Sequence, residues 1–432
     1  MRQLRSPRSP AAPAIEPAEL RPLGALENIM TAYAETASTT FTVVAEIEGE
    51  INAGEAETAL AAVQARHPLL NVGIRHSADG RRCFVRGAGP ILLDVLRPGA
   101  ATWEDVAGLE IRRRFDVENG PLLQVALLPE AKGTRLFFTF HHGMSDGKSA
   151  VFVIRDFLQA LNGQGLDPFL DADPIDQRLA ALVEPRRMEA AQDGASRQPA
   201  EVPAENRWGR GMDRRPIVTA RTVAPTLARR LREVSRFHDT TVHAALSVAV
   251  ARAVGALKGT DDPVRILSPV DQRAAMGTED ECGFFASVGK SAPAPNGNAF
   301  WEEARAARAA LEPFLGTDAA QGMIAAMAAH SAADDSPEGA CRFFGAFDFD
   351  VLLTNLGVLP IAAKYGRHRI KSITGPIVLA SAEGEQVIGV GTWKAGCSWS
   401  TPPSIRWRAC WNWSKASSRR PARRGDAAGA PA

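Results

Sequence analysis

Residues 136–147 read LFFTFHHGMSDG. The first five residues are apolar or β-branched, which is typical of a buried strand. Two adjacent histidines, His141 and His142, follow at the end of this strand, and Asp146 lies in the turn beyond them. A neutral imidazole can take up a proton near pH 7, so a histidine held in such a turn suits general-base catalysis on an alcohol, amine or thiol. Gly147 permits the bend that leads into the next element.

Strand and helix patterns alternate on both sides of this stretch. In the first half we predict strands at 41–49, 91–96, 121–129 and 135–140 and helices at 54–66 and 149–162. In the second half we predict helices at 226–237, 241–256, 301–312 and 318–330 and strands at 264–270, 349–354 and 370–379. The mixture of strands and helices in each half predicts layered α/β (α+β) domains rather than a helical bundle or a β-sandwich.

The composition limits the possible functions of the chain. Its 432 residues carry 50 Lys+Arg against 49 Asp+Glu, a balance that does not favour nucleic-acid binding. No uncharged apolar run is long enough to span a membrane. The five cysteines form no CxxC pair, which fits a reducing compartment, and we expect a cytoplasmic protein.

The sequence also suggests where the parts of the chain begin and end. A polar, proline-rich stretch separates two globular halves and is interpreted as a connecting segment, in which we predict a short helix at about 177–183. The predicted organisation is a disordered leader at 1–20, an N-terminal lobe at 21–170, a connecting segment at 171–206, a C-terminal lobe at 207–392 and an anomalous tail at 393–432.

Several segments together resemble a known family. HHGMSDG at 141–147 matches the HHxxxDG motif of the condensation-domain and chloramphenicol-acetyltransferase-like superfamily. Three further segments match that family in order and spacing: ARHPLL at 65–70, SPVDQR at 268–273 and DVLLTNLG at 350–357. Within the superfamily, the chain looks most like the stand-alone polyketide-associated (PapA-type) acyltransferases and the alcohol acetyltransferases.

The resemblance implies a fold of two chloramphenicol-acetyltransferase-like lobes that form a V with a tunnel between them. It implies that His142 is the general base and that Asp146 pairs with an arginine to hold the loop in shape, with Arg273 and Arg75 as candidates that the sequence does not separate. It also implies substrate-binding roles for His141, Gly147, Thr354, Asn355 and Gly357. Among these, the turn at 354–355 would donate a hydrogen bond to an oxyanion.

The implied activity is acyl transfer from a coenzyme A or carrier-protein phosphopantetheine thioester to an alcohol. A free-standing condensation domain that forms an amide is the alternative, and an inactive scaffold homologue is another, because Asn71 stands where fuller family motifs have an arginine. We expect a monomer that acts on a small-molecule acceptor, with an acyl carrier protein as a possible partner. No tightly bound cofactor and no metal are expected, since adjacent histidines on a strand point to opposite sides.

The last 40 residues differ from the rest of the chain. Five of the eight tryptophans, at 393, 399, 407, 411 and 413, lie within 21 residues, and no Asp or Glu occurs from 386 to 425. Family members have a strand and a closing helix at this place. One hypothesis is that the sequence leaves its native reading frame near 391–393, and the alternative is a genuine Trp-rich lid or tail.

Overall fold

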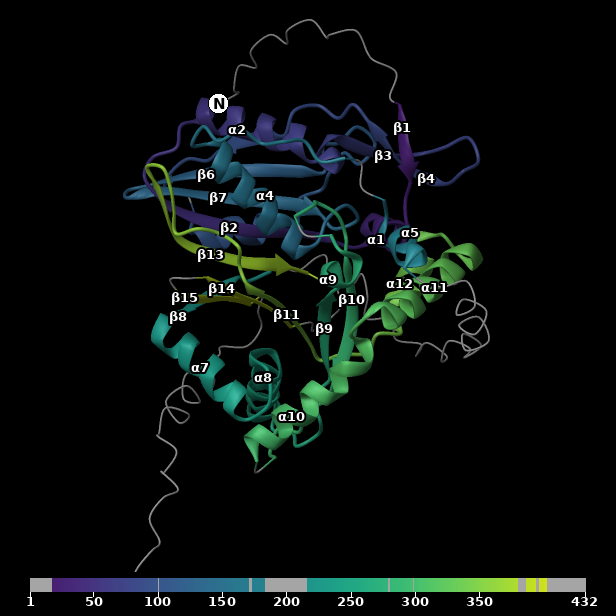
Figure 1. The fold of residues 1–432 in the computed structure, drawn as a ribbon, viewed down its shortest axis with the longest axis vertical. Coiled ribbons are helices and arrows are strands. Elements are labelled where there is room, and N and C mark those ends of the chain that lie inside the picture. The colour runs from purple at the N-terminus through teal and green to yellow at the C-terminus, as the bar shows by residue number, and fades with distance from the viewer. Residues whose placement is uncertain are drawn as a thin grey trace, which may run out of the picture.

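The computed structural model describes residues 18–99, 101–170, 173–182, 216–278, 280–297, 299–379, 386–393 and 396–401. Within these residues the chain forms two six-stranded mixed sheets and one three-stranded sheet, with helices packed around them (Figure 1). The predicted class of mixed helix and sheet layers is confirmed.

The first large sheet belongs mainly to the N-terminal half but is completed by a late segment of the chain. Its strand order is β12-β13-β2-β7-β6-β5. The strands are β2 (Thr40–Glu48), β5 (Leu92–Val95), β6 (Leu123–Glu130), β7 (Gly133–His141), β12 (Lys364–Tyr365) and β13 (His368–Val378). β13 pairs antiparallel with β2, with Ile373 opposite Ala45. Residues 364–378, which the sequence places in the C-terminal lobe, therefore extend the sheet of the N-terminal lobe.

The second large sheet belongs entirely to the C-terminal half. Its order is β10-β9-β11-β14-β15-β8. The strands are β8 (Thr219–Val223), β9 (Ile266–Asp271), β10 (Ala286–Ser291), β11 (Val351–Val358), β14 (Val387–Trp393) and β15 (Gly396–Thr401). β13 lies next to β14 and β15, so the two large sheets meet where the late strand crosses over (Figure 1).

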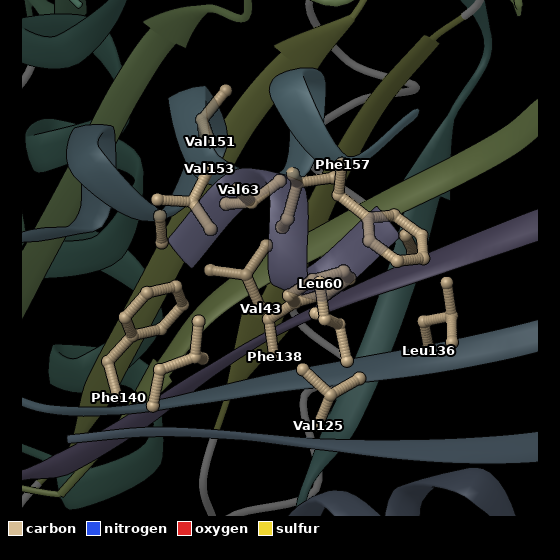
Figure 2. Close-up of a cluster of buried hydrophobic side chains, with 14 of the residues drawn as sticks. Val43, Leu60, Val63, Val125, Leu136, Phe138, Phe140, Val151, Val153 and Phe157 are labelled. Carbon is tan, nitrogen blue, oxygen red and sulfur yellow. The ribbon is translucent and has the colours of Figure 1, made fainter. Parts of the chain in front are cut away.

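The core of the N-terminal half lies between its sheet and two helices. Helices α2 (Ala53–Arg66) and α4 (Gly147–Ala160) cover one face of the sheet. Figure 2 shows their apolar side chains against those of β2, β6 and β7, with Val43, Leu60, Val63, Val125, Leu136, Phe138, Phe140, Val151, Val153 and Phe157 all buried. Burial of each such side chain contributes about 1.5–3 kcal/mol, and this packing fixes the end of β7 relative to the start of α4.

Other helices cover the remaining faces. Helix α3 (Trp103–Glu110) lies on the opposite face of the first sheet, while α7 (Pro225–Phe237), α8 (Val242–Lys258) and α10 (Phe300–Leu311) pack against the second. A group of four helices packs together beside β9 and β10: α1 (Ala25–Thr36), α5 (Ile175–Ala181), α11 (Thr317–Ala333) and α12 (Pro337–Gly345). Within the described residues no single helix is long and apolar enough to cross a bilayer, and α7 with α8 reaches that length only as a pair bent by 102°.

The remaining elements are short. The three-stranded sheet has the order β1-β4-β3 and consists of β1 (Glu19–Pro22), β3 (Val72–His76) and β4 (Arg82–Arg86). Helix α9 (Arg273–Met276) follows β9, and short 3₁₀ helices occupy Pro68–Asn71 and Glu312–Phe314.

Every strand and helix predicted from the sequence is present within a few residues of its expected bounds. The sequence pattern did not predict several other elements, among them α1, α3, α12, β3, β4, β8, β10 and β14. β1 begins at Glu19, inside the predicted leader. α5 lies inside the connecting segment, close to the short helix predicted there at about 177–183. β15 forms inside the predicted tail, for which the sequence pattern indicated no strand. The rest of that tail and most of the leader and connecting segment lie outside the described residues, so the reading-frame hypothesis and the domain boundaries stay predictions.

Candidate active site

The histidine pair lies between a strand end and a helix start. β7 ends at His141, and α4 begins at Gly147, so residues 142–146 form the whole connection. Asp146 is the N-cap of α4, and its Oδ1 accepts a hydrogen bond of 2.8 Å from the amide of Ser149. Aspartate is a preferred N-cap residue because it satisfies an amide that the helix leaves unpaired. The motif is therefore held at both ends by regular structure.

The ring of His142 has one nitrogen engaged and one available. Its Nδ1 lies 2.8 Å from the carbonyl oxygen of Ser145. A carbonyl oxygen only accepts hydrogen bonds, so Nδ1 carries the proton and Nε2 carries the lone pair. The half-buried ring stacks on Phe284 with a centroid distance of 4.8 Å and contacts Phe41 at 4.7 Å. This arrangement selects the tautomer that a general base needs.

Burial lowers the pKa of His142 below its ordinary value of 6.5. The hydrogen bond to Ser145 and the negative charge of Asp146 act in the opposite direction but do not outweigh the burial. His142 is therefore neutral at pH 7, which is the protonation state that accepts a proton from a substrate.

Asp146 forms a buried ion pair with Arg273. The two Nη atoms of Arg273 donate to the two carboxylate oxygens at 2.8 and 3.0 Å, and both residues are 4% exposed. Oδ2 of Asp146 also accepts from the amide of Phe285 at 2.9 Å. Burial alone would raise the pKa of Asp146, but the charge of Arg273 and these hydrogen bonds hold it below the usual range. The carboxylate thus stays ionised and acts on the shape of the turn.

The same ion pair joins the two halves of the chain. Arg273 begins α9 of the C-terminal half, and its Nη2 also donates to the hydroxyl of Ser149 at 2.6 Å. That hydroxyl donates to the carbonyl of Gly283 at 2.6 Å, while the amide of Asp146 donates to the same carbonyl at 3.1 Å. The motif of one half is therefore fixed by α9 and by the segment at 282–285 of the other.

A cavity of about 200 Å³ lies in front of His142. Its walls come from both halves, and most of its lining residues are apolar. The exceptions include Lys148 and Asp271, which form an ion pair of 2.7 Å. Tyr33 and Met323 contribute from α1 and α11. We call this space the apolar cavity. It can hold a hydrophobic group beside the ring of His142.

The structure brings together some of the predicted site residues. His142, Asp146, Gly147, Thr354 and Asn355 all line the apolar cavity. The structure also decides between the two candidate partners of Asp146, because Arg273 contacts this carboxylate. Arg75 instead donates to the carbonyl of Glu118 and the side chain of Asn119.

Two predicted residues lie elsewhere. Gly357 is not among the described residues that line the apolar cavity. Its φ of 69°, next to an irregularity in the pairing of β11 with β14, explains the glycine through backbone geometry. His141 lines a second cavity on the other side of the motif. No functional signal in the sequence marks Tyr33, Phe41 or Phe284, because they lie in ordinary apolar patterns.

Residues 30–168 match the family model described as condensation domain. This segment is therefore similar to condensation domains. The nonribosomal peptide synthetase kk1B of Curvularia clavata is 26% identical over 262 residues, or 56% of this chain. The chain spans only 2–3% of the lengths of the curated relatives it matches.

Solved structures extend the likeness beyond the matched segment. The condensation domain of the monacolin K polyketide synthase MokA superposes with a TM-score of 0.63 at 17% identity, covering 92% of this chain and 97% of that one. The trichothecene 15-O-acetyltransferase TRI3 of Fusarium sporotrichioides gives 0.62 at 13% identity, covering 92% and 93%. The condensation-domain fold therefore continues over nearly the whole chain, and the family resemblance drawn from HHGMSDG is confirmed.

Proposed function

We propose that this protein transfers an acyl group from a thioester to the hydroxyl of an acceptor, with His142 as the general base. The observation that carries the proposal is the orientation of one ring: Nδ1 is fixed by Ser145, and Nε2 is left for a substrate beside the apolar cavity.

The chemistry follows from that orientation. Nε2 of His142 takes the proton of the acceptor hydroxyl as its oxygen attacks the thioester carbonyl carbon. The C–S bond of the tetrahedral intermediate then breaks, and the proton passes from the imidazolium to the departing sulfur. The products are an ester, a free thiol and a neutral His142, so protons and electrons balance. Thr354 or Asn355, on the facing wall, would donate a hydrogen bond to the oxyanion.

The lining of the apolar cavity supports an acyl group as its occupant. An apolar chain placed there loses contact with water and gains contacts with the walls. The donor would be an acyl group on coenzyme A or on a carrier-protein phosphopantetheine arm. Amide formation is the second candidate, since the kk1B relative is a peptide synthetase. It would use the same base with an amine acceptor.

A thiol-release assay tests the proposal. Acyl-CoA donors of increasing length are combined with alcohol or amine acceptors, and the free thiol is measured with and without acceptor. We expect acceptor-dependent release and a loss of about 10²–10⁴-fold in kcat for His142→Ala. A matched variant, His243→Ala, changes a half-buried histidine of α8 that does not line the apolar cavity and serves as the control. An unchanged rate in His142→Ala would remove the proposed base, and release with amines alone would select the amide alternative.

A further inference from the structure

The second cavity, on the other side of the histidine pair, has a volume of about 800 Å³. Its walls are the end of α1, the end of β3, residues 112–118 and the ring of His141. Thr39 lines both this space and the apolar cavity, so the two adjoin at that residue. We call the larger space the basic cavity because arginines outnumber glutamates in its wall.

Two buried polar groups in its wall lack a partner among the described residues. Nδ1 of His141 accepts a hydrogen bond of 3.2 Å from the amide of Gly143, so the proton of His141 lies on Nε2. Nε2 is fully buried without a hydrogen-bond acceptor, and so is the hydroxyl of Thr39. His141 and Thr39 are each only 3% exposed. A buried donor without a partner costs about 1–3 kcal/mol, so these two donors together indicate a site for an acceptor that is supplied from outside.

The charges around the cavity indicate which kind of acceptor fits. Five arginines line it against two glutamates, Glu35 and Glu118. Arg82 and Arg113 are neutralised by carboxylates within 3.1 Å. Two other arginines also line the cavity: Arg75 hydrogen-bonds only uncharged groups in the described part of the chain, and Arg114 is exposed. The cavity therefore has an excess of positive charge, and guanidinium groups bind carboxylates and phosphates particularly well.

We propose that the basic cavity binds an anionic group, a carboxylate or a phosphate, carried by one of the two substrates of the acyl transfer. Nε2–H of His141 and the hydroxyl of Thr39 donate to the anion, and Arg75 and Arg114 supply the compensating charge. The inference rests on the proposed function and assigns to it a substrate class: one reactant is charged on the far side of the histidine pair, while the acyl group occupies the apolar cavity.

Direct binding separates this inference from the proposed function, because it requires no turnover. Calorimetry on the full chain uses two matched pairs of probes. Coenzyme A is compared with pantetheine, which lacks its phosphates, and 3-hydroxybutyrate is compared with its neutral amide. We expect the anionic member of one pair to bind more tightly than its neutral counterpart, with an affinity that falls as salt rises. The first pair identifies a phosphate and the second a carboxylate.

Two variants test the site itself. Arg114→Gln should weaken binding of that anion about three- to tenfold, whereas Arg230→Gln, an exposed arginine on α7 outside the cavity, should not change it. Thr39→Val keeps the shape of the side chain but removes an unpartnered hydroxyl. It should therefore preserve or raise Tm while weakening the binding of the anion. A merely structural Thr39 would not produce this split.

Two outcomes would overturn the inference. One is that neither anion binds more tightly than its neutral counterpart. The other is that Arg114→Gln and Arg230→Gln have equal effects. If thiol release fails while the anion still binds through Arg114 and Thr39, the proposed function is wrong and the anion site stands.

Discussion

Arg273→Met is the substitution that tests most directly how the site is held. It removes a guanidinium that makes two hydrogen bonds with Asp146 and leaves a carboxylate that is 4% exposed with only the amides of Ser149 and Phe285 as donors. Breaking a buried ion pair from one side costs about 3–5 kcal/mol because the remaining charge stays uncompensated. We expect a loss of that size in the free energy of unfolding, together with a lower kcat as the turn before α4 shifts His142.

The partner substitution should cost less. Asp146→Asn removes the charge but keeps the size, and Arg273 retains Asp271 at 3.0 Å, a carboxylate that is 28% exposed and so partly solvated. We expect this change to lower the free energy of unfolding by about 1–3 kcal/mol. In the double variant neither side leaves a lone charge, so the combined loss should be smaller than the sum by about 0.5–3 kcal/mol.

Urea titration of the four proteins measures this cycle. Arg229→Met is the matched control, since Arg229 faces Glu233 at 3.8 Å on the surface of α7, and exposed pairs contribute at most about 1 kcal/mol. The reasoning is refuted if Arg273→Met costs no more than this control, or if the two substitutions add without coupling.

The same pair gives a definite pH dependence. The pKa of Asp146 is lower in the folded chain than its ordinary value of 3.8, so the native state favours the ionised form. Its contribution is therefore fully present above that ordinary value and is lost as the pH falls through the lower, folded pKa. We expect the stability difference between the wild type and Asp146→Asn to be constant at neutral pH and to shrink only below about pH 4.

Three further changes have definite expected outcomes. Because burial lowers the pKa of His142, the acid limb of kcat/KM should have its midpoint below pH 6.5, and a midpoint above 6.5 would contradict a buried base. Gly143→Ala places a Cβ 2.5 Å from Oγ1 of Thr31 and should cost about 1–3 kcal/mol in urea titrations, while Gly89→Ala, with open space around its Cβ, should cost much less. Met323→Ala should shift donor preference toward longer acyl chains by about tenfold in relative kcat/KM across an acyl-CoA series, and an unchanged preference would place the acyl group elsewhere.

The part of the site that is local in sequence could be predicted from the sequence. β7, the turn and α4 are contiguous, and their pattern of apolar strand, polar turn and amphipathic helix depends on neighbouring residues alone. The pattern did not show that the third residue of HHxxxDG is constrained in this chain. Gly143 is required there because a side chain would collide with Thr31 and with the ring of His141.

The long-range part could not be predicted in the same way. Arg273 lies 127 residues from Asp146, and Asn71, where the family motif has an arginine, left the identity of the partner open. β13 reads as an ordinary strand of the second half, and nothing in its own sequence shows that it pairs with β2. Helix α1 was missed because it begins after a glycine without a side-chain cap, although it lines both cavities.

The ion pair also bears on how substrates reach the histidines. Asp146 is bonded at once to α4, to α9 and to the segment at 282–285, so moving the two halves apart at the motif would separate a buried charge from its partners. That separation would break the ion pair and its hydrogen bonds, which costs free energy. Entry through the cavities on either side of the motif avoids this cost, because neither route requires the pair to break. We therefore expect the two halves to stay joined at Arg273 throughout turnover, with the acyl group and the charged reactant approaching the histidine pair from its two sides.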